Sequence, residues 1–106
     1  MAIAPLRPRF VPVSLDLVPI GVHAGDLLAV VPLERFRGDG VYVLALEGVP
    51  TAVRCAANRY GEIDVVALHE GGGATIMTHT AFGELLLGQV LATCKVLDRT
   101  LLESSP

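Results

Sequence analysis

The chain has 106 residues, of which 52% are hydrophobic and 18% are charged, and its formal net charge at pH 7 is −3. This length suits one domain with one core, and the high apolar content excludes an intrinsically disordered chain. A negative net charge and a single lysine exclude a domain that binds nucleic acid through phosphate contacts. No apolar run approaches the roughly 18 residues that a membrane-spanning helix needs.

The two ends of the chain are predicted to lie outside the folded domain. Pro5 and Pro8 interrupt residues 1–9, which we expect to form an extended arm or linker. Residues 99–106 end in Glu-Ser-Ser-Pro and are predicted to be a C-terminal tail. A single domain is therefore predicted over residues 10–98. The two prolines also argue against a secretory signal, so we expect a cytoplasmic protein.

Glycines and prolines divide the chain into segments of about ten residues, a spacing typical of all-β domains. Residues 10–17 alternate apolar and other residues, whereas residues 27–31 and 41–46 are continuous apolar runs, as in strands covered on both faces. In chain order, strands are predicted over residues 10–17, 27–31, 41–46, 51–57, 62–68, 75–79 and 85–97.

Turns are predicted at residues 48–50, 58–61 and 71–73, the last a run of three glycines. Two segments, residues 81–89 and 97–103, compete as helices. Gly83 and Gly88 each cost about 1 kcal/mol in a helix interior. We therefore predict a mostly β fold with little helix.

Three histidines are candidates for metal binding, but no two of them have the spacing of an established metal motif. Strand pairing across the turn at residues 71–73 would bring His69 and His79 together, close to Glu70. The alternative is that the histidines lie at loop edges beside solvent. No metal or cofactor is predicted.

Nucleophilic side chains are few. Ser14 lies within the first predicted strand with its side chain expected to face outward, and Lys95 is expected to hold its ammonium group in solvent. Cys55 and Cys94 lie in apolar stretches and are predicted to be free, buried thiols. None of these residues forms a recognisable catalytic group with a base.

Several motifs occur in an order that resembles a known family. A Gly-Asp pair at residues 25–26 precedes an apolar strand, and Gly-Asp-Gly-Val-Tyr at residues 38–42 begins another. Ala-Val-Arg-Cys at residues 52–55 and Leu-Leu-Gly-Gln-Val at residues 86–90 follow. Over residues 10–97 this order resembles the C-terminal domain of LexA and the phage CI-type repressors, a Ser–Lys self-cleaving peptidase fold shared with UmuD. The resemblance implies a twisted β domain of the β-clip type that dimerises.

The catalytic pair of that family is not matched here. The serine position falls on Leu17, and the lysine position falls on Val53 or Arg54. Leucine offers no nucleophile and valine no base, and an arginine with a pKa above about 12 cannot act as a neutral amine. The resemblance therefore implies a pseudopeptidase that is not an enzyme.

The leading hypothesis is a non-catalytic LexA/CI-like oligomerisation domain in bacterial or phage transcription regulation. It would form a homodimer or pair with a repressor, without itself contacting nucleic acid or membrane. In the family the last strands contribute to the dimer, and we expect Leu87, Gln89, Leu91 and Thr93 to share the interface face.

Two alternatives remain open. The first is a binding module that uses the degenerate cleft, where Arg54 would capture a peptide or a carboxylate in bidentate fashion. The second is a hydrolase with relocated catalytic residues, in which Ser14 or Cys55 would work with a histidine.

Overall fold

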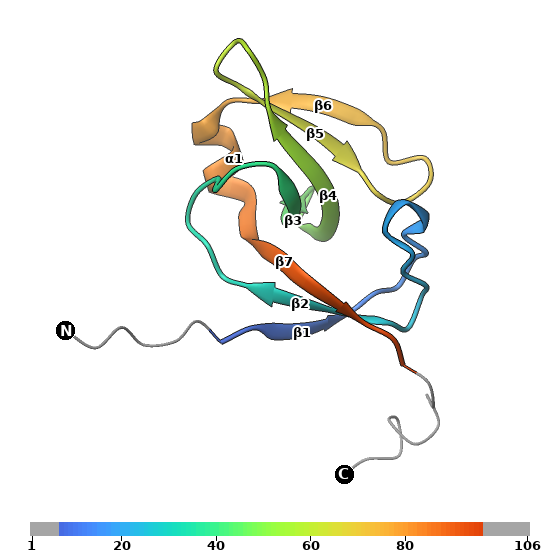
Figure 1. Ribbon diagram of the computed structural model, residues 1–106. Coiled ribbons are helices and arrows are strands. Elements are labelled where there is room, and N and C mark those ends of the chain that lie inside the picture. Colours follow the sequence, from blue (N-terminus) through green and yellow to red (C-terminus); the bar gives the residue numbers. More distant parts are fainter. Residues whose placement is uncertain (1–6, 97–106) are drawn as a thin grey trace, which may run out of the picture.

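The computed structural model describes residues 7–96 and confirms the predicted mostly β class (Figure 1). The strands are β1 (Arg9–Pro12), β2 (Leu27–Val31), β3 (Gly40–Leu46), β4 (Val49–Ala57), β5 (Ile63–Ala67), β6 (Ala74–Met77) and β7 (Leu86–Cys94). All seven form one antiparallel sheet in the order β1-β2-β7-β3-β4-β5-β6. Two short helices accompany the sheet, a 3-10 turn η1 (Val18–Ile20) and an α-helix α1 (His79–Leu85).

The first strand differs most from its prediction. It begins at Arg9, within the predicted arm, and ends at Pro12 rather than at residue 17. Beyond it, the Val13 N–H donates to the Asp26 carbonyl at 2.9 Å, and Leu17 forms an isolated bridge with Val22. Residues 13–17 therefore do not extend β1. They lie beside the sheet and are attached by these isolated backbone contacts.

The predicted turn at residues 48–50 is displaced by one residue. Glu47 and Gly48 have positive φ angles of 51° and 78°, as both central residues of a type I′ hairpin turn require. Val49 and Pro50 consequently belong to β4, where they pair with β3.

The helix α1 ends at Leu85, and the strand β7 begins at Leu86. The helix α1 contains Gly83, and its first turn is capped by Thr78, whose hydroxyl accepts from the Ala81 N–H at 3.1 Å. Phe82 is its one buried residue. The predicted alternative helix at residues 97–103 lies outside the described residues. Within residues 7–96, no helix has the length and apolar content to cross a membrane.

Apolar side chains fill both faces of the central strands, as the continuous apolar runs predicted. On β3, Tyr42 and Leu44 point to one face and Val43 points to the other, because side chains alternate along a strand. The first core cluster contains the buried residues Tyr42, Leu44, Val53, Cys55, Ile63, Val65 and Phe82. The second core cluster contains Leu17, Val22, Leu28, Val30, Val43 and Leu68.

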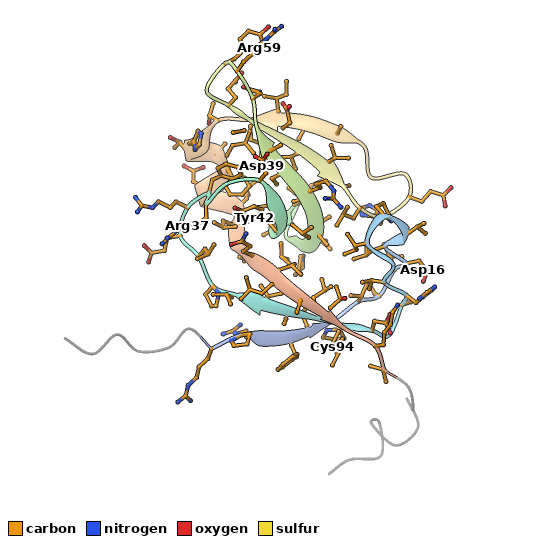
Figure 2. The ribbon with its side chains drawn as sticks, viewed as in Figure 1. Asp16, Arg37, Asp39, Tyr42, Arg59 and Cys94 are labelled. Carbon is orange, nitrogen blue, oxygen red and sulfur yellow. The ribbon has the colours of Figure 1, made fainter. Side chains whose placement is uncertain are left out.

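Tyr42 organises the segment that precedes β3. Its ring packs edge-on against Phe82 at 5.2 Å and stacks on Phe36 at 5.6 Å. Its hydroxyl donates to the Gly38 carbonyl at 2.7 Å and accepts from the Arg37 N–H at 3.0 Å (Figure 2). Burial raises the pKa of Tyr42, so the hydroxyl remains a neutral donor. One buried side chain therefore fixes the loop between β2 and β3.

The last strand, β7, contains two irregularities. Val30 pairs with Val90 and Ala29 with Ala92, so Leu91 has no direct partner on β2. On the other side of β7, Val43 of β3 pairs with Gly88 and Leu44 pairs with Leu86, so Leu87 has no direct partner on β3. An unpaired extra residue of this kind is a β-bulge, which bends the strand and increases its twist. β7 therefore crosses between β2 and β3 as a bent strand.

Candidate functional site

The structure does not bring together Leu17 and Val53, two of the three positions that the resemblance assigns to the catalytic pair. Leu17 is 3% exposed in the second core cluster, whereas Val53 is fully buried in the first. They lie on opposite sides of β4, because Val53 and its neighbour Ala52 point to opposite faces. Arg54 is exposed. The side chain of β4 that shares a cluster with Leu17 is Ala52.

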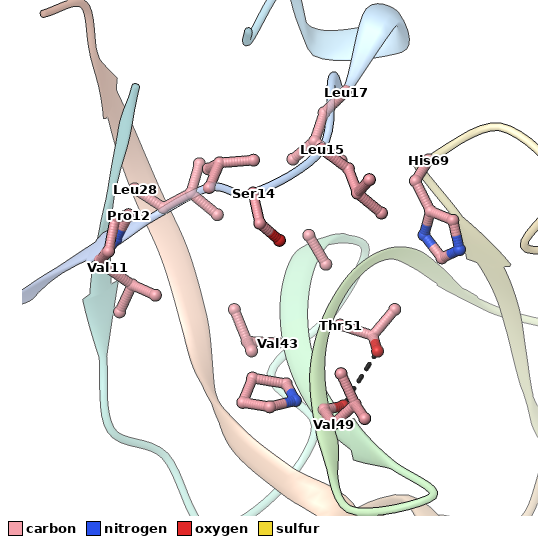
Figure 3. Close-up of a pocket in the computed structure, with 13 residues that line it drawn as sticks. Val11, Pro12, Ser14, Leu15, Leu17, Leu28, Val43, Val49, Thr51 and His69 are labelled. Atoms are coloured by element: carbon pink, nitrogen blue, oxygen red, sulfur yellow. Dashed lines mark hydrogen bonds between the residues drawn. The ribbon is translucent and has the colours of Figure 1, made fainter. Parts of the chain in front are cut away.

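An apolar groove of about 420 Å³ lies beside Leu17, between residues 11–15 and the start of β4 (Figure 3). Arg54 does not line it, so the structure does not place this residue where the carboxylate hypothesis needs it. The groove is lined by, among others, Val11, Ser14, Leu17, Val43, Thr51 and His69. The side chains that line the groove are therefore mostly apolar with a few hydrogen-bonding groups, as is typical of ligand pockets.

Three polar side chains line the apolar groove. The Thr51 hydroxyl donates to the Val49 carbonyl at 2.9 Å, whereas Ser14 and His69 lie on different walls (Figure 3). Among the residues drawn there, no hydrogen bond joins Ser14 to His69. Ser14 and His69 therefore do not contact each other directly, and both face the groove as potential ligand contacts.

Gly72 lies close to Ala67 and His69. A Cβ atom at residue 72 would lie 2.3 Å from Ala67 Cβ and 2.7 Å from the His69 imidazole, so a larger residue would clash with both side chains. The glycine at residue 72 of the predicted turn is therefore required by packing. The absence of a side chain at residue 72 leaves room for the His69 ring, and His69 lines the groove.

The predicted meeting of His69 and His79 is wrong. β5 and β6 pair from Ile63 opposite Met77 to Val66 opposite Ala74, so the two histidines lie beyond opposite ends of this hairpin. His79 instead packs edge-on against Phe36 at 5.8 Å. Within the part of the chain that the structure describes, no three His, Cys, Asp or Glu side chains are grouped to hold a metal ion.

The two cysteines are free, as predicted, but they differ in burial. Cys55 is buried in the first core cluster, where loss of solvation raises the pKa of its thiol to about 12. A thiol with such a pKa is not a nucleophile at neutral pH. Cys94 is only half-buried, on the last residue of β7.

An ion pair between Asp26 and Lys95 was missed by the sequence analysis, which expected the ammonium group in solvent. Lys95 Nζ donates to Asp26 Oδ2 at 2.8 Å and also to the Gly21 carbonyl, and it lies 3.1 Å from His23 Nδ1. The His23 backbone N–H donates to the same carboxylate oxygen at 2.9 Å. No local pattern signals this contact, because 69 residues separate the two partners.

The Asp26 carboxylate is strongly stabilised in its charged form. Hydrogen bonds from Lys95 and from the His23 N–H lower the pKa of Asp26 from 3.8 to about 2, although burial of the carboxyl opposes the shift. Together with the Val96 N–H, which donates to Asp26 Oδ1 at 3.3 Å, these bonds connect the end of β7 to the turn before β2.

Replacement of Asp26 by asparagine is expected to lower stability at neutral pH and to flatten its acid dependence. Because the folded pKa lies below the ordinary value, the ion pair contributes fully above about pH 4 and is lost as the pH falls toward about 2. Urea unfolding midpoints of wild type and variant should therefore converge over this range. Glu84→Gln, an exposed change on α1, serves as the control and should leave the wild-type profile unchanged. A constant difference between wild type and Asp26→Asn from pH 7 to pH 2 would contradict this role for Asp26.

The predicted interface residues of β7 do not share one face. Gln89 lies opposite Val31 and Thr93 opposite Leu28, and residues three apart on β2 point to opposite faces. The bulge at Leu91 causes this change, because an extra residue reverses the alternation of every side chain beyond it. Leu87 and Leu91, the two bulged residues, are exposed.

Comparisons of the chain with protein-family models, with curated proteins and with solved structures give no match. The resemblance to LexA and the CI-type repressors thus rests on the order of the sequence motifs and remains a prediction. The features of this chain that bear on function are its apolar groove, its Asp26–Lys95 ion pair and the exposed apolar side chains of β1 and β7.

Proposed function

We propose that the chain is a non-catalytic self-association domain of the LexA/CI type that acts in bacterial or phage transcription regulation, in the cytoplasm. The absence of catalysis is supported by the residue types at the positions that the resemblance assigns to the catalytic pair, because Leu17 offers no nucleophile and neither Val53 nor Arg54 offers a neutral amine. Self-association is supported by an uncharged face at one end of the sheet, formed by β1, β2 and β7.

This outer apolar face consists of two rows of paired residues. Side chains directly opposite one another on neighbouring strands lie on the same face of a sheet. Leu28 and Val30 of β2 point into the second core cluster, so the remaining β2 side chains belong to the other face. The two rows are Phe10, Ala29 and Ala92, and Pro12, Leu27 and Cys94.

The outer apolar face suits a second copy of the chain. Phe10 is 58% exposed, and the bulged Leu91 beside Ala92 is 62% exposed. Burying such a side chain completely is worth about 1.5–3 kcal/mol relative to exposure. In a two-fold dimer the same surface faces itself, and a face without charged residues brings no like charges together. The outer apolar face is therefore the observation that carries the proposal.

The substitution Leu91→Glu is expected to weaken the dimer by at least about tenfold, because each two-fold interface would bury two carboxylates. Phe10→Glu should act in the same way. Light scattering coupled to size-exclusion chromatography, from about 1 to 100 μM protein, measures the effect. The matched control is Ile76→Glu on β6, an equally exposed position at the far edge of the sheet.

Two results would contradict the proposal. A wild-type chain that remains a monomer across this concentration range does not self-associate through any face. If Ile76→Glu dissociates the dimer whereas Leu91→Glu and Phe10→Glu leave it intact, the dimer interface lies at the opposite end of the sheet.

A further inference from the structure

A second hollow adjoins the apolar groove. It has a volume of about 640 Å³, and Leu15 and His69 line both spaces. Asp16 and Glu70 are among the residues that line this second space, which we call the acidic hollow. The two spaces are thus neighbouring parts of one surface depression, separated by a shared ridge of Leu15 and His69.

The two spaces differ in charge. No aspartate, glutamate, lysine or arginine lines the apolar groove, whereas the acidic hollow carries two carboxylates and no lysine or arginine. Asp16 Oδ1 accepts from the Ala24 N–H at 2.8 Å, which holds this carboxylate in place. A ligand that fits both spaces is apolar at one end and cationic at the other, and an anionic ligand is disfavoured.

The wall formed by β4 offers an open strand edge. β5 pairs with β4 only from Val53 onward, so residues 49–52 extend beyond it. Leu46 and Val49 flank a two-residue turn and bond to each other, so the backbone groups of Pro50 and Ala52 point away from β3. The Ala52 carbonyl accepts from the Leu68 N–H at 3.2 Å. Because proline has no N–H, the groups that remain for an extended peptide are the Pro50 carbonyl and the Ala52 N–H.

We propose that this depression binds an extended peptide segment of a partner protein that carries uncharged apolar residues followed by a lysine or arginine. The apolar residues occupy the apolar groove, and the cationic side chain pairs with Asp16 and Glu70 in the acidic hollow. Ser14 and His69, which face the groove from different walls, hydrogen-bond the peptide backbone. This site uses neither Phe10 nor Leu91, and Pro12 is the residue that it shares with the outer apolar face.

The test is fluorescence anisotropy with three labelled peptides that share three valines and a glycine and end in lysine, glutamine or glutamate. The wild-type protein is expected to bind the lysine peptide at least about tenfold more tightly than the glutamate peptide at low salt, with the glutamine peptide between them. The double variant Asp16→Asn/Glu70→Gln keeps the acceptor for the Ala24 N–H. It should lose the preference for lysine and retain its affinity for the glutamine peptide.

A groove-filling variant tests the apolar part of the site. Ala52→Leu places a larger side chain in the groove and should weaken all three peptides by about tenfold or more. Ala56→Leu is the matched control, four residues along the same strand, on the same face and outside both spaces. Thermal melts of all variants establish that each one is folded.

Three outcomes would overturn the proposal: wild type binds none of the peptides saturably up to about 1 mM, the double variant retains the preference for lysine, or Ala52→Leu and Ala56→Leu bind equally well. Loss of the lysine preference in the double variant, together with weaker binding by Ala52→Leu, supports it.

Discussion

Replacement of Gly88 by alanine is expected to destabilise the protein by about 3 kcal/mol, near the upper end of the usual cost of overpacking. Gly88 is buried on β7, where a Cβ atom would lie 2.5 Å from the Val31 backbone oxygen and 2.6 Å from Val30 Cγ1. Relief of the first clash requires movement of the β2 backbone itself. Because β7 joins β2 to β3, this movement would disturb the centre of the sheet. Urea unfolding measures the change.

The same substitution at Gly83 is the matched control and should have the opposite sign. Gly83 lies within α1, where the nearest atom to a new Cβ would be the Glu34 backbone oxygen at 3.5 Å, an ordinary contact. Alanine is favoured over glycine in a helix interior by about 1 kcal/mol. Equal destabilisation by the two substitutions would show that the close approach of β2 and β7 does not determine the effect.

Replacement of Phe82 by alanine is expected to cost about 4 kcal/mol of unfolding free energy. The Phe82 ring is completely buried and packs edge-on against Tyr42 at 5.2 Å and Phe36 at 5.5 Å. Because it is the one buried side chain of α1, its loss removes the main attachment of the helix as well as a core aromatic. The near-ultraviolet circular dichroism signal of the aromatic cluster should weaken with it.

The control for this substitution is Tyr60→Ala. Tyr60 is exposed, in the loop between β4 and β5, and its replacement should change stability by no more than about 0.5 kcal/mol. A cost below about 1 kcal/mol for Phe82→Ala would mean that α1 does not close the first core cluster.

Strands that are covered on both faces could be predicted from the sequence. Leu27–Val31 matches its prediction residue for residue, because a run of five apolar residues between Asp26 and Pro32 predicts a buried strand without reference to its neighbours. The helix at residues 79–85 was harder to predict. Its glycine opposes helix formation, and its formation depends on the burial of Phe82 by β3, a contact between distant residues.

The bulges of β7 show where sequence patterns stop being informative. A glycine inside a strand, such as Gly88, often accompanies a bulge, but a bulge is defined by how two strands pair, and one strand alone does not specify it. The predicted common face of Gln89 and Thr93 failed for this reason. The groove could not be predicted from the sequence either, because only the fold brings the segments that carry Ser14 and His69 to its two walls.

The place of β7 in the sheet also determines when the protein can fold during synthesis. β1 and β2 pair with each other, and β3, β4, β5 and β6 pair in succession, but these two groups are joined in the sheet only through β7. β7 is the last of the described strands to leave the ribosome. Until then no strand pairing joins the two groups, and each has exposed strand edges, which are sites of aggregation.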